Sequence, residues 1–264
     1  MKSRLDAVSF LNSRPLTIAL EAPNDFFDLS YDLPSVCADR LRDGEVDLGL
    51  IPSIEYARAA DAYAMVPQVA VGCYGAVFSV RLFHQVALNN IRRIALDTSS
   101  RTSVALLQIL LRLHYGIDPE MVATQPNLDT MLASADAALL IGDPVFSVLD
   151  KGVPSIDLGM AWQEFSGLPF VFAFWAGRQG VLMPHQAQRL VDARLEGVRR
   201  ISEIARDFSR DSGGDVTVYE KYLHDNIRFD LGGRELAGLR HFYTLAAQQG
   251  LIKAAPRLCF YALV

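Results

Sequence analysis

Short apolar runs that suit buried strands alternate with segments that suit helices between residues 5 and 141. Strands that alternate with helices form parallel sheets whose two faces the helices cover. The pattern therefore predicts a protein of the α/β class. Strands are predicted at 5–10, 46–51, 64–71, 75–80, 93–96 and 137–141, and helices at 16–20, 35–42, 53–60 and 104–113.

The last third of the chain has a different pattern, which predicts helices alone. Apolar residues recur at helical spacing over 186–208, 219–227 and 234–249. Gly250 follows the last of these segments, at the place where a left-handed glycine closes a helix. We therefore expect a helical C-terminal segment beside the α/β part.

Composition excludes several classes of protein. With 264 residues, 51% of them hydrophobic and 21% charged, the chain is long enough for one large or two small domains. A formal net charge of −5 indicates no general affinity for nucleic acid or for an anionic membrane surface. No apolar run reaches the roughly 20 residues of a membrane span. The first residues do not read as a secretory signal, so we expect a cytoplasmic protein.

Cysteines, histidines and motifs argue against a metal ion or a cofactor. Cys37, Cys73 and Cys259 are odd in number and form no Cys-x-x-Cys pair, so a disulfide framework or a cysteine metal site is not expected. The five histidines lack the spacing of a ligand set. No dinucleotide-binding, P-loop, serine-hydrolase or zinc-protease motif occurs. We predict no cofactor and no metal site.

The segment 97–103 (Asp-Thr-Ser-Ser-Arg-Thr-Ser) joins a predicted strand to a predicted helix. Its last five residues place four hydroxyls and a guanidinium at the first turn of that helix. Free N–H groups and the positive end of the helix dipole favour a carboxylate or phosphate there. The alternative is that Ser99 or Ser100 merely caps the helix and the other residues are solvated. One cap, however, needs one hydroxyl.

Residues 45–53 and 134–143 share an arrangement: the end of a helix, an Asp, a buried strand, and a tight turn with a small polar group. Together they would give two matched lobes. Each lobe would present the carboxyl end of a strand to a shared crevice, where open α/β sheets bind ligands. Gly142 and Asp143 would line that crevice, although an ordinary turn explains them equally well. The residues alone predict an anion-binding α/β protein and name no reaction.

An aromatic-rich stretch surrounds Pro169. We expect most of its rings to form core or hinge packing, with at most one ring reaching a ligand. The rings are those of Trp162, Phe170, Phe172, Phe174 and Trp175.

Five segments carry a family resemblance: residues 8–16, 47–56, 99–103, 139–143 and 168–175. In this order they resemble the chorismate dehydratases of the futalosine route to menaquinone. Phe10 departs from the pattern, because the family usually has Tyr there. A sister family of the same pathway usually carries a Ser-Pro-Cys-Pro-Asn-Asp type of segment near the N-terminus, which this chain lacks.

The resemblance implies a two-lobed α/β fold like that of the type II periplasmic binding proteins, with a ligand cleft between the lobes and a helical C-terminal segment. Lobe one would comprise residues 1–79 and 175–264, and lobe two residues 80–174. The crossing segments would lie near 78–81 and 169–175. A fold of this kind in the cytoplasm favours an enzyme over a component of an importer.

The implied reaction removes water from chorismate to give 3-[(1-carboxyvinyl)oxy]benzoate, a carbon–oxygen lyase reaction that needs no cofactor. The resemblance makes Asn12 the best catalytic residue, whose amide would hold the substrate or the departing hydroxyl. The alternative for Asn12 is a turn residue before Pro15. We assign the binding of one substrate carboxylate to the hydroxyls and backbone N–H groups of Ser100, Thr102 and Ser103 at the helix start, with Arg101 as a further candidate. The full set expected to bind substrate is Ser53, Ser79, Ser99, Ser100, Arg101, Thr102, Ser103, Gly142 and Asp143.

Two rival functions stay open from the sequence. One is a non-catalytic cytoplasmic protein of this fold that binds carboxylates. The other is the sister activity, a 1,4-dihydroxy-6-naphthoate synthase acting on a nucleoside-derived substrate. In each case the expected partner is a small molecule, with neither nucleic acid nor membrane, and the oligomeric state is not predicted.

Overall fold

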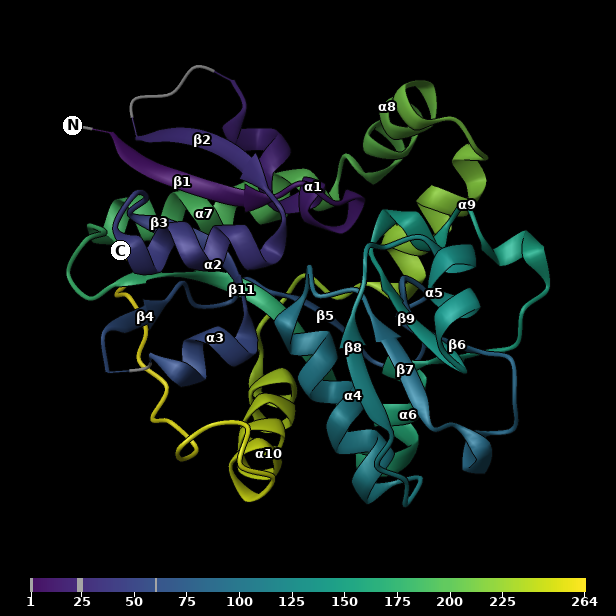
Figure 1. Cartoon of the computed structure of the whole chain (residues 1–264). Coiled ribbons are helices and arrows are strands. Elements are labelled where there is room, and N and C mark those ends of the chain that lie inside the picture. Colours follow the sequence, from purple (N-terminus) through teal and green to yellow (C-terminus); the bar gives the residue numbers. More distant parts are fainter. Residues whose placement is uncertain (1, 23–25, 60) are drawn as a thin grey trace.

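A computed structural model of the chain describes residues 2–22, 26–59 and 61–264, and it has two sheets (Figure 1). The strand order in the first sheet is β2-β1-β3-β11-β4, and β5 also pairs with β11. Strands β1, β2 and β3 are parallel, whereas β11 runs antiparallel to its neighbours. The strands are β1 (Ser3–Val8), β2 (Phe27–Asp32), β3 (Leu48–Pro52), β4 (Tyr63–Met65), β5 (Val71–Cys73) and β11 (Phe170–Arg178).

The second sheet has five strands in the order β10-β6-β9-β7-β8. Strands β7, β8 and β9 are parallel, and β6 lies antiparallel between β9 and β10. In Figure 1 the first sheet lies to the left and the second to the right. The strands are β6 (Val80–His84), β7 (Arg93–Leu96), β8 (Glu120–Ala123), β9 (Ala137–Ile141) and β10 (Ser155–Asp157).

Alternation along β9 shows how the second sheet is packed on both faces. Ala138 and Leu140 belong to a small apolar cluster that also contains Leu128 and Met131 of α5. Leu139 and Ile141 belong instead to the main core of the molecule. Successive side chains of a strand point to opposite faces, so a continuous apolar run marks a strand buried on both faces.

Helices connect the strands of the α/β part. Helix α2 ends at Gly44, which adopts φ 79° in the left-handed region. The α-helices are α1 (Arg14–Thr17), α2 (Pro34–Asp43), α3 (Ser53–Arg58), α4 (Arg101–Leu113), α5 (Leu128–Ser134) and α6 (Leu158–Ser166). Short 3₁₀ turns are η1 (Leu11–Ser13), η2 (Ile18–Leu20), η3 (Leu88–Asn90), η4 (Asp143–Val145) and η5 (Leu149–Lys151).

The C-terminal segment is helical, as predicted. Helix α7 packs on α1, where a Cβ on Gly197 would lie 1.9 Å from the carbonyl oxygen of Pro15. The expected single helix over 186–208 is wrong, because the chain turns at Arg199 and Arg200. The elements are α7 (Pro184–Val198), α8 (Ile201–Ser212), α9 (Val216–Lys221), the π-helical turn η6 (Tyr222–Asn226) and α10 (Gly233–Gln248).

Three other expected elements differ from the structure. The predicted strand 64–71 is divided into β4 and β5, with Gln68 between them at φ 64°. The predicted strand 75–80 is absent, because Gly75 and Phe78 adopt φ 100° and 68°, which extended strands do not allow. The predicted helix 53–60 ends at Arg58, and Ala60 lies outside the described residues.

The chain crosses between the sheets twice. It leaves the first sheet after β5, enters the second at β6, and returns to the first sheet with β11. Strand β11 pairs within the first sheet from Phe170 onward. The assignment of residues 1–79 and 175–264 to one lobe and 80–174 to the other stays a prediction.

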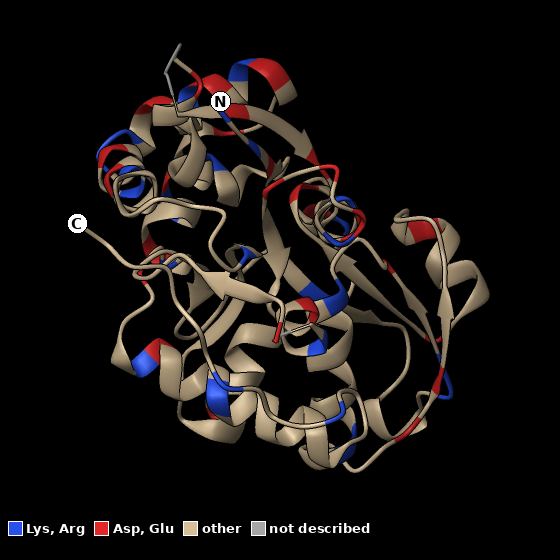
Figure 2. Cartoon of the chain, turned by 90° about the vertical axis from the view of Figure 1, so that its left-hand side faces the viewer, with Lys and Arg blue, Asp and Glu red and all other residues tan. Residues whose placement is uncertain are grey.

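Charged residues are distributed over the surface without one dominant sign. Figure 2 shows Lys and Arg interspersed with Asp and Glu over the same elements. Many of them pair, as Arg4 does with Asp47 at 2.8 Å and Arg112 with Asp118 at 2.9 Å. In the part of the chain that the structure describes, no helix combines the length and apolarity that a membrane crossing needs.

Candidate active site

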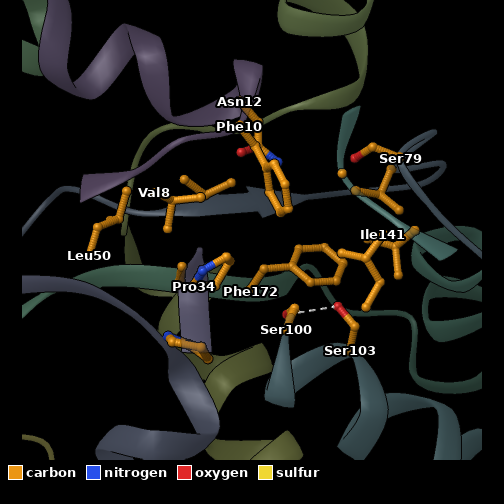
Figure 3. Close-up of a pocket in the computed structure, with 16 residues that line it drawn as sticks. Val8, Phe10, Asn12, Pro34, Leu50, Ser79, Ser100, Ser103, Ile141 and Phe172 are labelled. Carbon is orange, nitrogen blue, oxygen red and sulfur yellow. Dashed lines mark hydrogen bonds between the residues drawn. The ribbon is translucent and has the colours of Figure 1, made fainter. Parts of the chain in front are cut away.

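A narrow pocket lies between the two sheets, near the carboxyl ends of β1, β3 and β9 (Figure 3). The empty space between its walls, open solvent included, is about 480 Å³, and a water molecule fits in only a small part of it. Phe10 and Phe172 approach each other across this space. A ring-sized molecule therefore needs these walls to move apart before it can bind.

The walls of the pocket are mostly apolar, with a few polar groups. Asn12, Ser79, Ser100 and Ser103 supply the polar side chains. Among the sixteen described residues that line the pocket, none is Asp, Glu, His, Cys, Tyr, Lys or Arg. The pocket can therefore bind an anion only through hydroxyl, amide and backbone N–H donors.

The start of α4 supplies one polar end of the pocket. Ser103 donates its hydroxyl hydrogen to Oγ of Ser100 at 3.1 Å, and both side chains are buried. Ser100 is the N-cap residue of α4, yet its side chain makes no capping hydrogen bond to the helix. The capping alternative therefore does not describe Ser100. The two hydroxyls lie at the positive end of the helix dipole, where a carboxylate is stabilised.

Arg101 points out of the pocket. Its guanidinium donates to Asp39 at 2.7 Å and to Glu55 at 3.2 Å. The guanidinium of Arg101 in turn lowers the pKa of Asp39. Because both ends of the guanidinium are paired with carboxylates of the protein, this geometry does not support Arg101 as a substrate ligand.

Thr102 and Ser53 also lie outside the lining of the pocket. Thr102 Oγ1 accepts a hydrogen bond from the backbone N–H of Ile54 at 3.1 Å and lies 3.4 Å from Ser53 Oγ. Ser53 donates its hydroxyl to the carbonyl oxygen of Val171 at 2.8 Å. Both side chains are fully buried. These hydroxyls tie α3, α4 and β11 together, so their assignment to substrate binding stays a prediction that the geometry does not favour.

Ser99 contributes its backbone to the turn before α4. Its N–H donates to Asp97 Oδ1 at 2.9 Å, and its carbonyl oxygen accepts from the N–H of Ser35 at 2.9 Å. Burial raises the pKa of Asp97. Ser99 is not among the residues that line the pocket, so its predicted contact with substrate is not part of this geometry.

The turn after β1 brings Phe10 and Asn12 to the pocket. Ser13 Oγ donates to the carbonyl oxygens of Val8 and Phe10, the latter at 2.8 Å, and holds the turn closed. Pro15 then stands in the first turn of α1, where its lack of an N–H is harmless. Asn12 faces the pocket as well as preceding Pro15 (Figure 3).

Ser79 lies on the crossing segment before β6, and its hydroxyl is 2.8 Å from the hydroxyl of Tyr222. Both side chains are almost completely buried. Burial raises the pKa of Tyr222 well above its ordinary value, while hydrogen bonds with the side chains of Ser79 and Asn12 act in the opposite direction. Tyr222 is therefore a protonated phenol beside two polar residues of the pocket.

Gly142 and Asp143 occupy the turn after β9. Gly142 adopts φ 74°, and a Cβ there would lie 2.7 Å from the ring of Phe10. The Asp143 carboxylate accepts hydrogen bonds from the N–H of Leu11 at 3.0 and 3.1 Å, 132 positions away in the chain. Burial raises the pKa of Asp143 to about 6, although the Leu11 N–H lowers it. Gly142 lines the pocket, whereas Asp143 supports the turn that carries Asn12.

Sequence reasoning missed two parts of the site. Tyr222 lies in the helical C-terminal segment and belongs to no motif, so only the three-dimensional structure places it beside Ser79. Of the six aromatic rings from Trp162 to Trp175, only Phe172 lines the pocket. The alternation along β11 could have suggested one ring, but not which one.

The sequence of this chain is similar to those of known proteins. Residues 3–248 match the sequence profile of a family described as menaquinone biosynthesis. This chain belongs to that family. A chorismate dehydratase of Thermus thermophilus is 33% identical over 234 residues, which cover 82% of this chain and 85% of that protein.

Solved structures of the same fold agree with the predicted class. A protein of Archaeoglobus fulgidus superimposes with a TM-score of 0.75 at 19% identity and covers 95% of this chain and 98% of its own. The alkanesulfonate-binding protein SsuA of Xanthomonas axonopodis pv. citri, bound to MOPS, gives a TM-score of 0.69 at 16% identity, with coverages of 97% and 94%. These likenesses confirm the two-sheet, periplasmic-binding-protein-like α/β fold with its helical C-terminal segment.

Proposed function

We propose that this chain is a chorismate dehydratase, a lyase that forms 3-[(1-carboxyvinyl)oxy]benzoate. The observation that carries the proposal is the pocket itself, which combines hydroxyls at the start of α4 with no titratable side chain among its described lining residues. A cofactor-independent elimination from a dicarboxylate suits such a pocket. The menaquinone biosynthesis family and the 33% identical chorismate dehydratase point to the same reaction.

The start of α4 is the proposed binding site for one substrate carboxylate. Ser100 and Ser103 offer hydroxyls, and the first N–H groups of the helix have no partner within the helix. Together they form an anion site without a cation. The apolar walls, including Phe10 and Phe172, would contact the ring of the substrate.

The proton must leave the ring without help from the pocket's own side chains. Elimination breaks a ring C–H bond and the neighbouring C–O bond, and the resulting aromatic ring drives the reaction forward. We propose that the side-chain carboxylate of the substrate accepts the proton. The protein then contributes orientation and exclusion of water, which are worth roughly 7–11 kcal/mol in favourable cases.

Asn12 is the proposed catalytic residue. Its amide faces the pocket near Ser79. An amide both donates and accepts, so it can hold the departing hydroxyl or fix the substrate in the reactive pose. The remaining parts of the proposal are a cytoplasmic location and a place in the futalosine route to menaquinone.

The test compares wild type with Asn12→Ala and with Asn90→Ala, an exposed asparagine of η3. Each purified protein is incubated with chorismate, and products are separated by chromatography beside a control without enzyme. We expect rapid product formation by wild type and Asn90→Ala, and a loss of about 100-fold or more in Asn12→Ala. Wild-type turnover in Asn12→Ala would remove that residue from the mechanism.

Wild-type protein that does not convert chorismate would contradict the proposed function. A thermal shift by chorismate without turnover would then identify a non-catalytic binding protein. Activity on the cyclic futalosine derivative alone would identify the sister naphthoate synthase.

A further inference from the structure

The C-terminal helical segment reaches the pocket through one side chain, Tyr222. It lies on the π-helical turn η6, and its hydroxyl is 2.8 Å from Ser79 Oγ. π-helical turns are rare and are found frequently at functional sites. Tyr222 does not line the pocket, so any effect it has on a substrate passes through the residues it holds.

Hydrogen bonds hold the backbone of Ser79 and of the turn that precedes it. Its N–H donates to the carbonyl oxygen of Val77 at 2.8 Å, which closes a three-residue turn around Phe78 at φ 68°. Such a turn around a bulky residue is strained and persists only when neighbours hold it. The carboxylate of Asp157 accepts from the N–H groups of Val77 and Phe78, and the carbonyl oxygen of Ser79 accepts from Gly142 at 2.8 Å.

After the backbone is fixed, the hydroxyl of Ser79 retains only the rotation of its own side chain. A serine side chain has three staggered positions of similar energy. The Tyr222 hydroxyl selects one of them by its hydrogen bond. Either hydroxyl can donate in this bond, and donation by Tyr222 would give its buried O–H an acceptor. The hydrogen of Ser79 would then be free to point into the pocket.

Aromatic packing prevents the Tyr222 ring from moving. Its ring meets Phe146 edge-on at a centroid distance of 5.1 Å and Phe78 at 6.0 Å. These three rings come from η6, the turn after β9 and the crossing segment. The ring therefore brings together elements of both sheets and of the C-terminal segment.

We propose that Tyr222 is a positioning residue, whose hydroxyl orients the Ser79 hydroxyl toward the substrate. The inference rests on the proposed function for its kinetic readout. The oriented group is the Ser79 O–H, a donor suited to a carboxylate or hydroxyl of the substrate. A loss of the Tyr222 hydroxyl leaves the ring packing in place and removes only this orientation.

The experiment is a double-mutant cycle with Tyr222→Phe, Ser79→Ala and the double variant. Tyr261→Phe is the matched control, because its buried hydroxyl also makes a hydrogen bond, to the carbonyl oxygen of Arg178. We expect Tyr222→Phe to lower kcat for chorismate about tenfold with little change in KM. Tyr261→Phe should keep the wild-type kcat. In the Ser79→Ala background Tyr222→Phe should cause no further loss.

Two results would overturn the inference: a wild-type kcat in Tyr222→Phe, or the same fold-loss from Tyr222→Phe in both backgrounds. Wild-type protein that does not convert chorismate would contradict the proposed function instead. The inference is then decided by crystal structures of wild type and Tyr222→Phe. A changed rotamer of Ser79 in the variant supports it, and an unchanged rotamer of Ser79 overturns it.

Discussion

The first turn of α4 has two faces that carry similar residues and do different things. Ser100 and Ser103, three positions apart, share the face that meets the pocket. Arg101 and Thr102 lie between them in the sequence and bind carboxylates and a backbone N–H of the protein. A run of polar residues at a helix start therefore need not form one site, because successive residues of a helix point in different directions.

The same division holds elsewhere in the molecule. Asn12 and Ser79 face the pocket from outside α4. Ser53 and Asp143, in contrast, are engaged by other protein groups. Members of the first set are expected to affect turnover when changed, and members of the second set are expected to affect stability. The following variants test that difference.

The largest effect is expected from the double variant Ser100→Ala with Ser103→Ala. A bound carboxylate would lose the hydroxyl groups of both serines in a pocket without a cation, which costs about 100-fold or more in kcat/KM. The unfolding free energy should change little, since the two hydroxyls bond to one another. Steady-state kinetics and chemical denaturation measure the two quantities. Unchanged kcat/KM would show that the anion site lies elsewhere.

Asp143→Asn tests a member of the second set through the pH dependence of the unfolding free energy. Burial raises the pKa of Asp143 to about 6, from an ordinary value of 3.8. Because the pKa is higher in the folded protein, the Asp143 carboxyl loses its proton at a lower pH in the unfolded chain than in the folded protein. The associated stability is present below about pH 4 and is lost as pH rises to about 6, a change of roughly 2–3 kcal/mol. The unfolding free energy of Asp143→Asn should lack this pH-dependent contribution.

Urea unfolding of wild type and Asp143→Asn at several pH values between about 4 and 7 measures this difference. Charged and titratable groups near Asp143 include Arg14, Tyr219 and Tyr222. The same pH dependence in both proteins would show that Asp143 does not titrate in this window.

The smallest effect on turnover is expected from Thr102→Val. The variant keeps the shape of the side chain but leaves the Ile54 N–H without its acceptor, at a cost of about 1–2 kcal/mol in unfolding free energy. Its kcat/KM should stay at the wild-type value. A loss as large as that of the serine pair would place Thr102 in the substrate site and would remove the proposed division of α4.

The fold could be predicted from sequence because its central strands, such as β3 and β9, are buried on both faces. The runs in β3 and β9 are continuous and apolar, and a covered parallel sheet requires this. The errors over the predicted strands 64–71 and 75–80 fall where residues adopt positive φ. Gln68 and Phe78 are neither Gly nor Asn, so their left-handed conformation has no signal in the sequence.

The site was predicted only in part, for a related reason. The hydroxyl-rich helix start was visible as a pattern, and it places Ser100 and Ser103 in the pocket. Which hydroxyls face inward depends on the contacts of α3 and β11 with α4, and these contacts are long-range. The role of Tyr222 depends on the fold of the C-terminal segment, which local sequence does not report.

The most direct test of the central claim is the pH dependence of kcat for conversion of chorismate by wild type. A pocket lined by no titratable side chain, with the proton taken by a carboxylate of the substrate, predicts formation of 3-[(1-carboxyvinyl)oxy]benzoate at a rate that is flat between about pH 6.5 and 9. Absence of that product, or a step in the profile that a substitution in the protein removes, would contradict the account.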